Sequence, residues 1–249
     1  MPDINPLTNE ELDLLRSFDT PTICNVIELF EVRPATTGYM DRRIRCWFPN
    51  LPPMVGYAVT STLMGSVPPR RPTAYKMIDR QLEAFAEVPA PQVMVFQDLD
   101  DPSRAAAFGD VMCSIYRAFG AAGLVSGGPG RDIEQVRALN FPVFAGGVIC
   151  SHGYPQIVDV NVPVSVGGVV VHPGDLLHAD ANGVTTIPHE IASEVAHACR
   201  EFADAEAVIL DYLRDNPTPS LKELAAHRDQ AMAQMARMRD RLTRRQVSV

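Results

Sequence analysis

The sequence predicts an α/β fold with helices at its N-terminus and two more helices at its C-terminus. Between residues 92 and 145, short apolar runs rich in β-forming residues alternate with helical patterns, which is typical of an α/β sheet. Residues 157–188 are rich in valine and are interrupted by Gly-Gly, Pro-Gly-Asp and Asn-Gly. This pattern of valine-rich runs and turn-forming residues predicts a set of short antiparallel strands joined by tight turns.

Two helices are expected at the start of the chain. In "NEELDLLRSF", apolar residues recur at helical spacing after Thr8 or Asn9, and Glu11 is placed to complete a capping box. "DTPTICNVIELF" then begins a second helix. Prolines are frequent between residues 34 and 72, so we expect loops there around one strand, "GYAVTSTLMG".

The middle of the chain alternates strands and helices. "QVMVFQDL" predicts a buried strand that ends at the acidic turn "DLDDPS". "FGDVMCSIYRAFGAAG" predicts a helix, because Val111, Ile115 and Phe119 recur every four residues and Gly123 stands where it would stop. "LVSGG" then predicts a strand, "RDIEQVRAL" a short helix and "FPVFAGG" another strand.

Two amphipathic helices follow Pro188, separated by the helix-breaking "NPTPS". The second should present an apolar stripe of Leu221, Leu224, Met232, Met235, Met238 and Leu242. We therefore divide the chain into an α/β core with its N-terminal helices, residues 1–188, and a helical extension, residues 189–249. The extension is expected to pack on the core or on a neighbouring subunit.

Composition excludes several classes of protein. With 22 basic and 30 acidic side chains the net charge is -8, which disfavours nucleic-acid binding. The first residues lack the basic start and apolar run of a secretory signal, and no apolar run approaches the roughly 18 residues that a membrane span needs. The five cysteines are scattered without a C-x-x-C spacing, so neither a disulfide framework nor a zinc site is indicated. We expect a cytoplasmic protein with no membrane or nucleic-acid partner.

Two neighbouring motifs could carry chemistry, and the first is "FGDVM", residues 108–112. Gly109 allows close backbone approach at a helix entrance, where the free N–H groups of the first turn can bind an anion such as a carboxylate. Asp110 lies at this point. The alternative for Asp110 is a first-turn acid that only stabilises the helix.

The second motif is "SGGPGRDI", residues 126–133. Its three glycines form a loop without side-chain walls at the end of a strand, where open α/β sheets usually bind ligands. Arg131 and Asp132 follow at the start of the next helix. The structural alternative is that Asp132 and Gln135 form a capping pair and that Arg131 forms a salt bridge nearby.

Together, "GDVM" at 109, "GRD" at 130, "FPVFAGG" at 141, "VPVSVGGVVVHPGD" at 162 and "ADANGVTTIP" at 179 resemble one family. It contains the regulator of ribonuclease activity A and the class II 4-hydroxy-4-methyl-2-oxoglutarate aldolases, and the resemblance covers roughly residues 18–190. It implies a swivelling β/β/α-type core, layered α-β-β-α, and homotrimers or homohexamers with active sites between subunits. One branch contains metal-dependent aldolases that also decarboxylate oxaloacetate, and the other contains noncatalytic inhibitors that bind a ribonuclease.

The resemblance also implies roles for the charged pair. Asp132 would anchor a divalent metal, Mg²⁺ or Mn²⁺, partly through water. Arg131 would bind the substrate and stabilise the negative oxygen of the pyruvate enolate as the carbon–carbon bond breaks.

The resemblance also implies roles for residues 109–112, at the start of the predicted helix. The resemblance maps the family's Gly-acid pair onto Gly109 and Asp110. The amides of Val111 and Met112 would hold the substrate carboxylate, and Asp110 would position or activate a water that exchanges protons with the substrate.

The chain departs from the family pattern in its loop. Family members often read Asp-Gly-x-x-Arg-Asp, whereas this chain reads Gly127-Gly128-Pro129-Gly130-Arg131-Asp132 and so lacks one acid. The aldolase pattern also includes an acid from a neighbouring subunit's C-terminal region, for which Glu201, Asp204 and Glu206 are candidates.

Other polar residues could belong to the site or have a structural role. His152 could line the same pocket, although a histidine in a loop is more often a hydrogen-bonding residue. Arg70 and Arg71 could reach a second carboxylate of a dicarboxylic substrate, although a solvated loop is the more common case. Asp175 and Asp180 fall in tight turns, where aspartate has a structural role.

The sequence thus indicates a divalent-metal-dependent lyase that cleaves a 4-hydroxy-2-oxo acid, of the 4-hydroxy-4-methyl-2-oxoglutarate type, to pyruvate and that could decarboxylate oxaloacetate. The alternative is a noncatalytic oligomeric regulator that binds and inhibits a partner enzyme such as a ribonuclease. Retention of both Arg131 and Asp132 favours catalysis.

Overall fold

The N-terminal helices form where the sequence predicts them. The structure is a computed structural model that describes residues 4–69 and 74–246. Helix α1 (Asn9–Arg16) begins with the expected capping box, in which the Thr8 hydroxyl accepts from the Glu11 amide and the Glu11 carboxylate accepts from the Thr8 amide. Helix α2 (Thr20–Leu29) follows, with the Asp19 side chain as its N-cap. Both helices therefore start at side chains that satisfy free N–H groups.

Parallel strands occupy the centre of the sheet. Among the described residues the main sheet has eight strands in the order β1-β5-β4-β3-β2-β9-β10, with β6 pairing with β2 beside this path. Strands β2 to β5 run parallel to one another, and β1, β6, β9 and β10 pair antiparallel. The bounds are β1 (Arg45–Cys46), β2 (Met54–Met64), β3 (Gln92–Asp98), β4 (Gly123–Ser126), β5 (Val143–Ala145), β6 (Gln156–Val160), β9 (Leu176–Asp180) and β10 (Gly183–Ile187).

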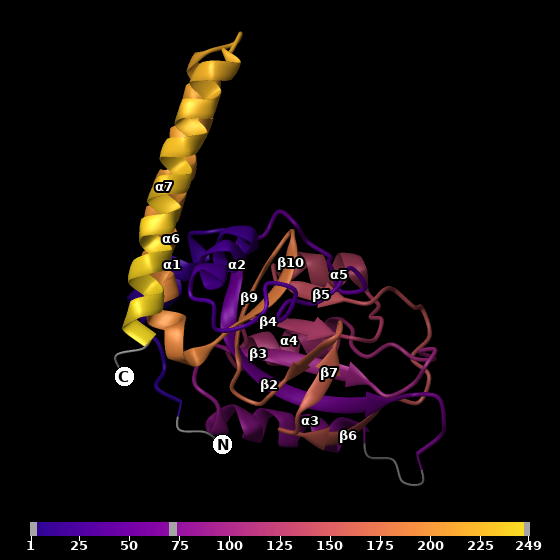
Figure 1. Cartoon of the computed structure of the whole chain (residues 1–249). Coiled ribbons are helices and arrows are strands. Elements are labelled where there is room, and N and C mark those ends of the chain that lie inside the picture. The colour runs from indigo at the N-terminus through magenta and orange to yellow at the C-terminus, as the bar shows by residue number, and fades with distance from the viewer. Residues whose placement is uncertain (1–3, 70–73, 247–249) are drawn as a thin grey trace.

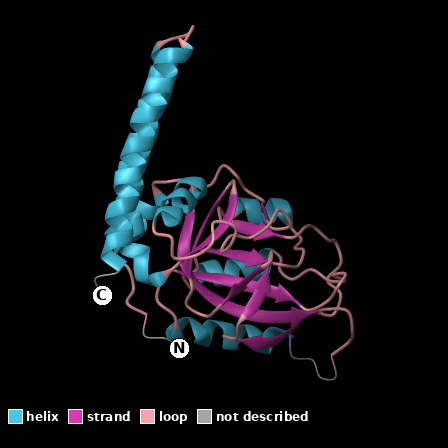
Figure 2. Cartoon of the chain, in the orientation of Figure 1, coloured by secondary structure: helices cyan, strands magenta, loops and turns pink. Residues whose placement is uncertain are grey.

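Different layers cover the two faces of this sheet (Figures 1 and 2). One face packs on helices α3 (Ala74–Glu83), α4 (Asp110–Ala118) and α5 (Ile133–Ala138) and on a 3-10 turn, η1 (Ala84–Glu87). The other packs on the hairpin of β7 (Val164–Val166) and β8 (Val169–Val171). The α/β class and the antiparallel C-terminal strands are thus confirmed.

Strand β3 shows why its sequence is continuously apolar. Met94 and Phe96 belong to the hydrophobic cluster on the helical face, whereas Val93 and Val95 belong to the cluster under β7–β8. A strand buried on both faces has no solvent side, so apolar and polar residues do not alternate along it.

The predicted face of α4 was wrong. Val111 and Phe119 are 54% and 61% exposed, and the buried residues of this helix are Cys113 and Tyr116. The helix also ends earlier than expected, at Ala118, and Gly120 takes the left-handed backbone at a φ of 93°. The four-residue spacing indicated the wrong face because the buried side chains are not aliphatic. They are the thiol of Cys113 and the phenol of Tyr116, whose hydroxyl makes a buried hydrogen bond.

The C-terminal helices form a hairpin that extends beyond the core (Figure 1). After a 3-10 turn, η2 (His189–Ile191), α6 (Ala192–Asp215) packs on α1 and α2, and α7 (Leu221–Gln246) returns along α6. Of the predicted α7 stripe, Met238 and Leu242 are buried at the base, whereas Leu221 and Met232 are 83% and 61% exposed. Within one chain, α7 therefore packs on α6 and, at its base, on α2, and packing of the exposed part of the stripe on a neighbouring subunit stays a prediction.

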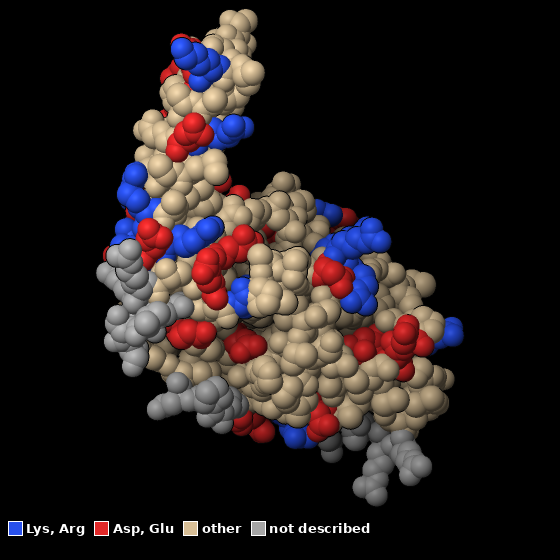
Figure 3. All heavy atoms as spheres, in the orientation of Figure 1, with Lys and Arg blue, Asp and Glu red and all other residues tan. Residues whose placement is uncertain are grey.

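Charges of both signs line the hairpin on the face shown in Figure 3. None of the described helices is sufficiently long and apolar to cross a bilayer.

Candidate active site

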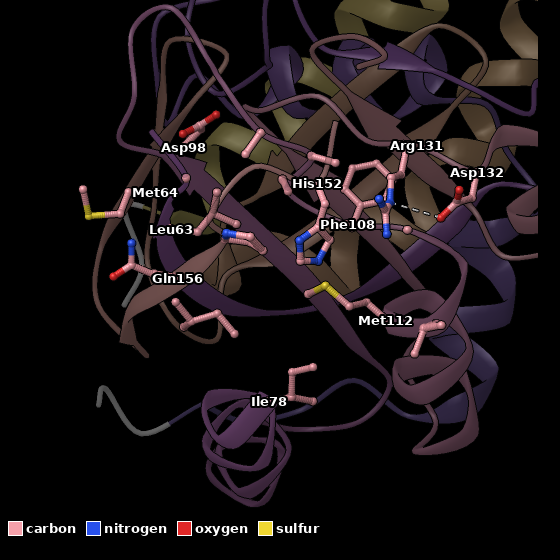
Figure 4. A pocket seen from close by; sticks show the side chains of 18 of the residues that line it. Leu63, Met64, Ile78, Asp98, Phe108, Met112, Arg131, Asp132, His152 and Gln156 are labelled. Atoms are coloured by element: carbon pink, nitrogen blue, oxygen red, sulfur yellow. Dashed lines mark ion pairs between the residues drawn. The ribbon is translucent and has the colours of Figure 1, made fainter. Parts of the chain in front are cut away.

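A pocket opens at the carboxyl ends of β2 and β3, beside the residues that follow the glycine loop after β4 (Figure 4). Met64 is the last residue of β2, Asp98 is the last residue of β3, and the glycine loop follows β4. Because these strands are parallel, their carboxyl ends meet at one edge of the sheet, which is where open α/β sheets bind ligands. The same pocket is lined by all six predicted site residues: Gly109, Asp110, Val111, Met112, Arg131 and Asp132.

The glycine loop is fixed rather than free. Ala107 N–H donates to the Pro129 carbonyl at 2.7 Å, and Gly130 exchanges hydrogen bonds of 3.0 Å with the segment of Gly147 and Ile149. A Cβ at Gly130 would lie 2.2 Å from the Phe108 ring, and a Cβ at Gly128 would lie 2.7 Å from the Asp98 carboxylate. These glycines are therefore needed for close packing between neighbouring segments.

Asp132 does not cap its own helix. It stands at the N-cap position of α5 with a left-handed backbone, φ 59° and ψ 42°, and makes no side-chain cap hydrogen bond. Its Oδ2 instead faces the start of α4, 3.4 Å from the Asp110 amide nitrogen. The proposed capping pair with Gln135 is thus wrong. Left-handed backbone in a non-glycine residue costs about 1 kcal/mol or more, so the surrounding loop must impose this conformation.

Arg131 and Asp132 face the pocket together. The Arg131 Nε lies 3.4 Å from the Asp132 Oδ2, and the two side chains are 34% and 30% exposed. Figure 4 shows both on one side of the pocket with the ion pair between them. The predicted nearby salt bridge is therefore made to Asp132 itself, and it leaves both groups accessible from the cavity.

The entrance of α4 supplies further polar groups. Gly109 is the N-cap and offers no side-chain hydrogen bond to the first turn. A Cβ there would lie 2.5 Å from the Asp132 Oδ2, so glycine allows the two helix starts to approach. The Asp110 Oδ1 accepts from the Val111 amide at 2.7 Å. Of the two predicted carboxylate-binding amides, that of Val111 is already engaged, which leaves the Met112 amide as the better candidate.

Buried polar contacts hold α4 in place. The Tyr116 hydroxyl donates to the Gln81 Oε1 at 2.6 Å, and the Gln81 Nε2 donates to the Ser61 hydroxyl at 2.9 Å. This chain links α4 through α3 to β2. Burial, together with the charges of Asp110 and Asp132, raises the pKa of the Cys113 thiol to about 12, so this thiol is protonated and inert as a nucleophile.

Sequence reasoning missed several lining residues. Asp98, Leu63, Ile78 and Gln156 also line the pocket. Asp98 could have been found, because it is the acid that ends a strand whose carboxyl end faces the site. The others come from segments distant in sequence and carry no local signal.

The other candidate site residues lie in different parts of the chain. His152, for which a loop role was the more common case, lines the pocket. Glu201 forms a two-contact ion pair with Arg241 at 2.6 and 3.1 Å within the helical hairpin. Arg70 and Arg71 lie outside the described residues.

The two turn aspartates have structural roles, as predicted. Asp175 accepts from the His172 amide, and Asp180 accepts from the amides of Thr20 and Asn182.

The pocket offers oxygen ligands to a cation. In the described ranges, no three His, Cys, Asp or Glu side chains cluster closely enough to hold a metal by themselves. Asp110 and Asp132 nevertheless lie next to each other at two helix starts that line the cavity. Mg²⁺ is usually bound through one or two carboxylates and keeps several waters, so this donor set suits Mg²⁺ or Mn²⁺ better than a site enclosed by protein ligands.

Comparison with known sequences identifies relatives. The family model RraA-like, described as Aldolase/RraA, matches residues 20–186. A protein of Halalkalibacterium halodurans named "Putative 4-hydroxy-4-methyl-2-oxoglutarate aldolase" is 41% identical over 128 residues, which are 51% of this chain and 60% of that protein. An uncharacterized protein of Methanocaldococcus jannaschii is 37% identical over 91 residues, 36% of this chain and 44% of that protein. The chain thus matches less than two thirds of the length of either relative.

Solved structures share the fold. An uncharacterized protein from Pseudomonas syringae pv. tomato superposes with a TM-score of 0.70 at 22% identity, covering 90% of this chain and 96% of that one. Streptomyces coelicolor RraAS2, described as an unusual member of the RNase ES inhibitor RraA family, gives a TM-score of 0.65 at 24% identity, covering 81% and 96%.

Proposed function

This chain belongs to the RraA-like family, and we propose that it is a divalent-metal-dependent carbon–carbon lyase that cleaves a 4-hydroxy-2-oxo acid to pyruvate. One observation carries the proposal. Arg131 and Asp132 both face the pocket, and Asp132 leaves its own helix uncapped to do so. An aspartate whose role was to cap α5 would instead accept from the first turn of that helix.

The reaction is a retro-aldol cleavage. The C4 hydroxyl loses its proton, the C3–C4 bond breaks, and C4 becomes a carbonyl carbon. The electron pair of that bond forms the enolate of pyruvate, which is then protonated at C3. Decarboxylation of oxaloacetate would pass through the same enolate, so one site could serve both reactions.

Each of three site residues would have a separate role in this reaction. The Arg131 guanidinium would stabilise the enolate oxygen as its charge develops, a contribution commonly worth about 3 kcal/mol. The Met112 amide, at the positive end of α4, would bind the substrate carboxylate. The Asp110 carboxylate would position the water that takes the hydroxyl proton and returns a proton to C3.

The cation would bind at Asp132. Asp132 would hold Mg²⁺ or Mn²⁺ partly through water, and the bound cation supplies Lewis-acid polarisation of the 2-oxo group. The close approach of the Asp132 Oδ2 to Arg131 and to the Asp110 amide keeps this carboxylate oriented toward the cavity.

Pyruvate release tests the proposal. The purified protein is assayed with 4-hydroxy-4-methyl-2-oxoglutarate and with oxaloacetate, in Mg²⁺, in excess chelator, and as Asp132→Ala. We expect release in Mg²⁺ that chelator abolishes and that the variant loses by more than tenfold. Absence of metal-dependent turnover of both compounds would favour the other family function, a noncatalytic oligomeric regulator that binds a partner enzyme.

A further inference from the structure

We propose that His152 is a specificity-determining residue whose imidazole N–H donates a hydrogen bond to the second carboxylate of a dicarboxylic substrate. This inference rests on the proposed function, which places the 2-oxo acid end of the substrate at Arg131 and Asp132. A 4-hydroxy-2-oxo acid of the glutarate type carries its second carboxylate on C4. That group must therefore bind in another part of the same pocket.

Hydrogen bonds hold the backbone on both sides of His152 against the pocket wall. The Ser151 carbonyl accepts from the Ala106 amide, and the Tyr154 amide donates to the Gly65 carbonyl, both at 3.0 Å. Ala106 and Gly65 themselves line the pocket. Position 152 is therefore fixed relative to the cavity, although it lies in a loop.

Gly153 strengthens this attachment. Its backbone is left-handed, at a φ of 54°, and a Cβ there would lie 2.5 Å from the Ala105 Cβ and 3.1 Å from the Gly65 carbonyl oxygen. Its amide donates to the Ser151 hydroxyl at 3.2 Å. Only glycine suits both this backbone and this close packing, so the loop lies tightly on the residues that form the wall.

The His152 side chain lines the pocket without a partner of its own. Across residues 4–69 and 74–246, no hydrogen bond or ion pair involves its ring. The neighbouring Gln156 differs, because its Nε2 donates to the backbone carbonyls of Val67 and Tyr154, at 2.8 and 3.3 Å. An imidazole carries at least one N–H in either protonation state. The His152 ring therefore has a donor available for a ligand.

The surroundings of the ring suit a carboxylate that is held by a donor. Figure 4 shows the His152 ring near the centre of the pocket, on the side of Arg131 away from Asp132. The residue is exposed, so a carboxylate bound there keeps part of its contact with water. Asp98 and Asp110 line the same pocket, and their charges disfavour a carboxylate that lacks a partner. A hydrogen bond from a ring N–H to the charged group opposes that repulsion.

The experiment separates binding of the second carboxylate from chemistry at the enolate. Pyruvate release from 4-hydroxy-4-methyl-2-oxoglutarate and exchange of the pyruvate methyl protons for deuterium are both measured in Mg²⁺, because pyruvate has no second carboxylate. We expect His152→Ala to lower kcat/KM for release at least tenfold, chiefly by raising KM, and to change the exchange rate less than threefold. The melting temperature should not change, since the side chain is exposed.

Further variants test the chemistry of the contact. His152→Asn and His152→Gln each keep an amide donor, near the positions of the ring Nδ1 and Nε2 respectively. At least one of them should keep kcat/KM for release within fivefold of the parent value. His152→Asp should lower kcat/KM below that of His152→Ala, because it places a like charge beside the second carboxylate.

The outcomes separate the two proposals. Equal kcat/KM in the parent and His152→Ala overturns the role of His152 and leaves the lyase intact; the second carboxylate would then bind to other groups, for which Arg70 and Arg71 are the candidates from the sequence. Equal losses of release and exchange in His152→Ala would place the ring at the enolate and overturn its distal role. Absence of pyruvate release by the parent overturns the lyase and, with it, this inference.

Discussion

At the scale of single residues, the Asp132 carboxylate turns away from the helix it begins and toward the start of another helix. Two glycines make room for this arrangement in different ways. Gly109 faces the end of the rotatable Asp132 side chain, whereas Gly130 faces the ring of Phe108, which is only 1% exposed. Substitution at these two positions should therefore separate function from stability.

Gly109→Ala should impair the site and spare the fold. Its backbone is extended, at φ -154°, so alanine is tolerated, but the new Cβ displaces the Asp132 carboxylate. We expect a more than tenfold loss of pyruvate release with an unchanged free energy of unfolding. Gly130→Ala is the matched control, for which overpacking against Phe108 should lower the free energy of unfolding by about 1–3 kcal/mol. Urea denaturation and the release assay check both variants, and a strongly destabilised Gly109→Ala would contradict this assignment.

The sequence could reveal the residue types of the site but not their orientation. Arg131, Asp132 and Gly109 were found because glycines and charges cluster at predicted helix starts. An aspartate at a helix start looks the same in sequence whether it caps that helix or not. The left-handed backbone of Asp132 depends on hydrogen bonds between loops 20 or more residues apart in the chain, such as Arg131 N–H to Phe108.

At the scale of elements, a buried histidine fastens the N-terminal helices to the sheet. The His178 ring on β9 is fully buried, with its Nδ1 2.9 Å from the Thr20 hydroxyl and its Nε2 3.0 Å from the Leu15 carbonyl. Because a carbonyl oxygen only accepts, Nε2 donates to Leu15, and in the neutral ring Nδ1 then accepts from the Thr20 hydroxyl. Burial lowers the pKa of His178, although the charges of Asp180 and Asp19 partly oppose this effect.

The protein should therefore lose stability in mild acid. The unfolded chain binds a proton at His178 below the ordinary pKa of about 6.5, whereas the folded chain resists it. The free energy of unfolding should fall as pH drops below this value, by at most about 1.4 kcal/mol per pH unit for this one group. Urea denaturation between pH 7.5 and 5.5 measures the slope. His178→Gln should remove this contribution, and an identical slope in the variant would contradict it.

The sequence predicted an element well where that element is buried on both faces. It predicted a helix poorly where one face of the helix lines the pocket and another faces the core. Strand β3 was predicted from its continuous apolar run, which burial on both faces produces. The face of α4 was not, because Val111 lines the pocket while Tyr116 is buried through a hydrogen bond to Gln81. Apolar spacing cannot distinguish a residue that faces a cavity from one that faces the core.

At the scale of the whole molecule, the lining of the pocket brings together β2, α3, α4 and β6. No sequence window contains these four segments, so the full lining of the pocket could not be predicted from local patterns. The same holds for the α6–α7 hairpin, whose periodicity predicted a docking stripe without showing where along the helix docking stops.

The outer hairpin leaves large apolar side chains in water. Leu210, Leu221 and Met232 are more than 60% exposed. We expect subunit association to cover part of this surface, and the resemblance to the family implies homotrimers or homohexamers. Sedimentation equilibrium should give about three or six times the chain mass of 27.3 kDa. A monomer at micromolar concentration would contradict this expectation and would leave each site to be completed by one chain alone.

The central claim is that Arg131 and Asp132 together stabilise the enolate of pyruvate. Exchange of the pyruvate methyl protons for deuterium tests it directly, because exchange passes through that enolate and needs no distal group. Proton NMR of pyruvate in D₂O with Mg²⁺ should show exchange faster than with Mg²⁺ alone. Chelator should abolish the acceleration, and Arg131→Ala and Asp132→Ala should each reduce it more than tenfold at an unchanged melting temperature. Exchange that is absent in the parent, or equal in the parent and both variants, would contradict the claim.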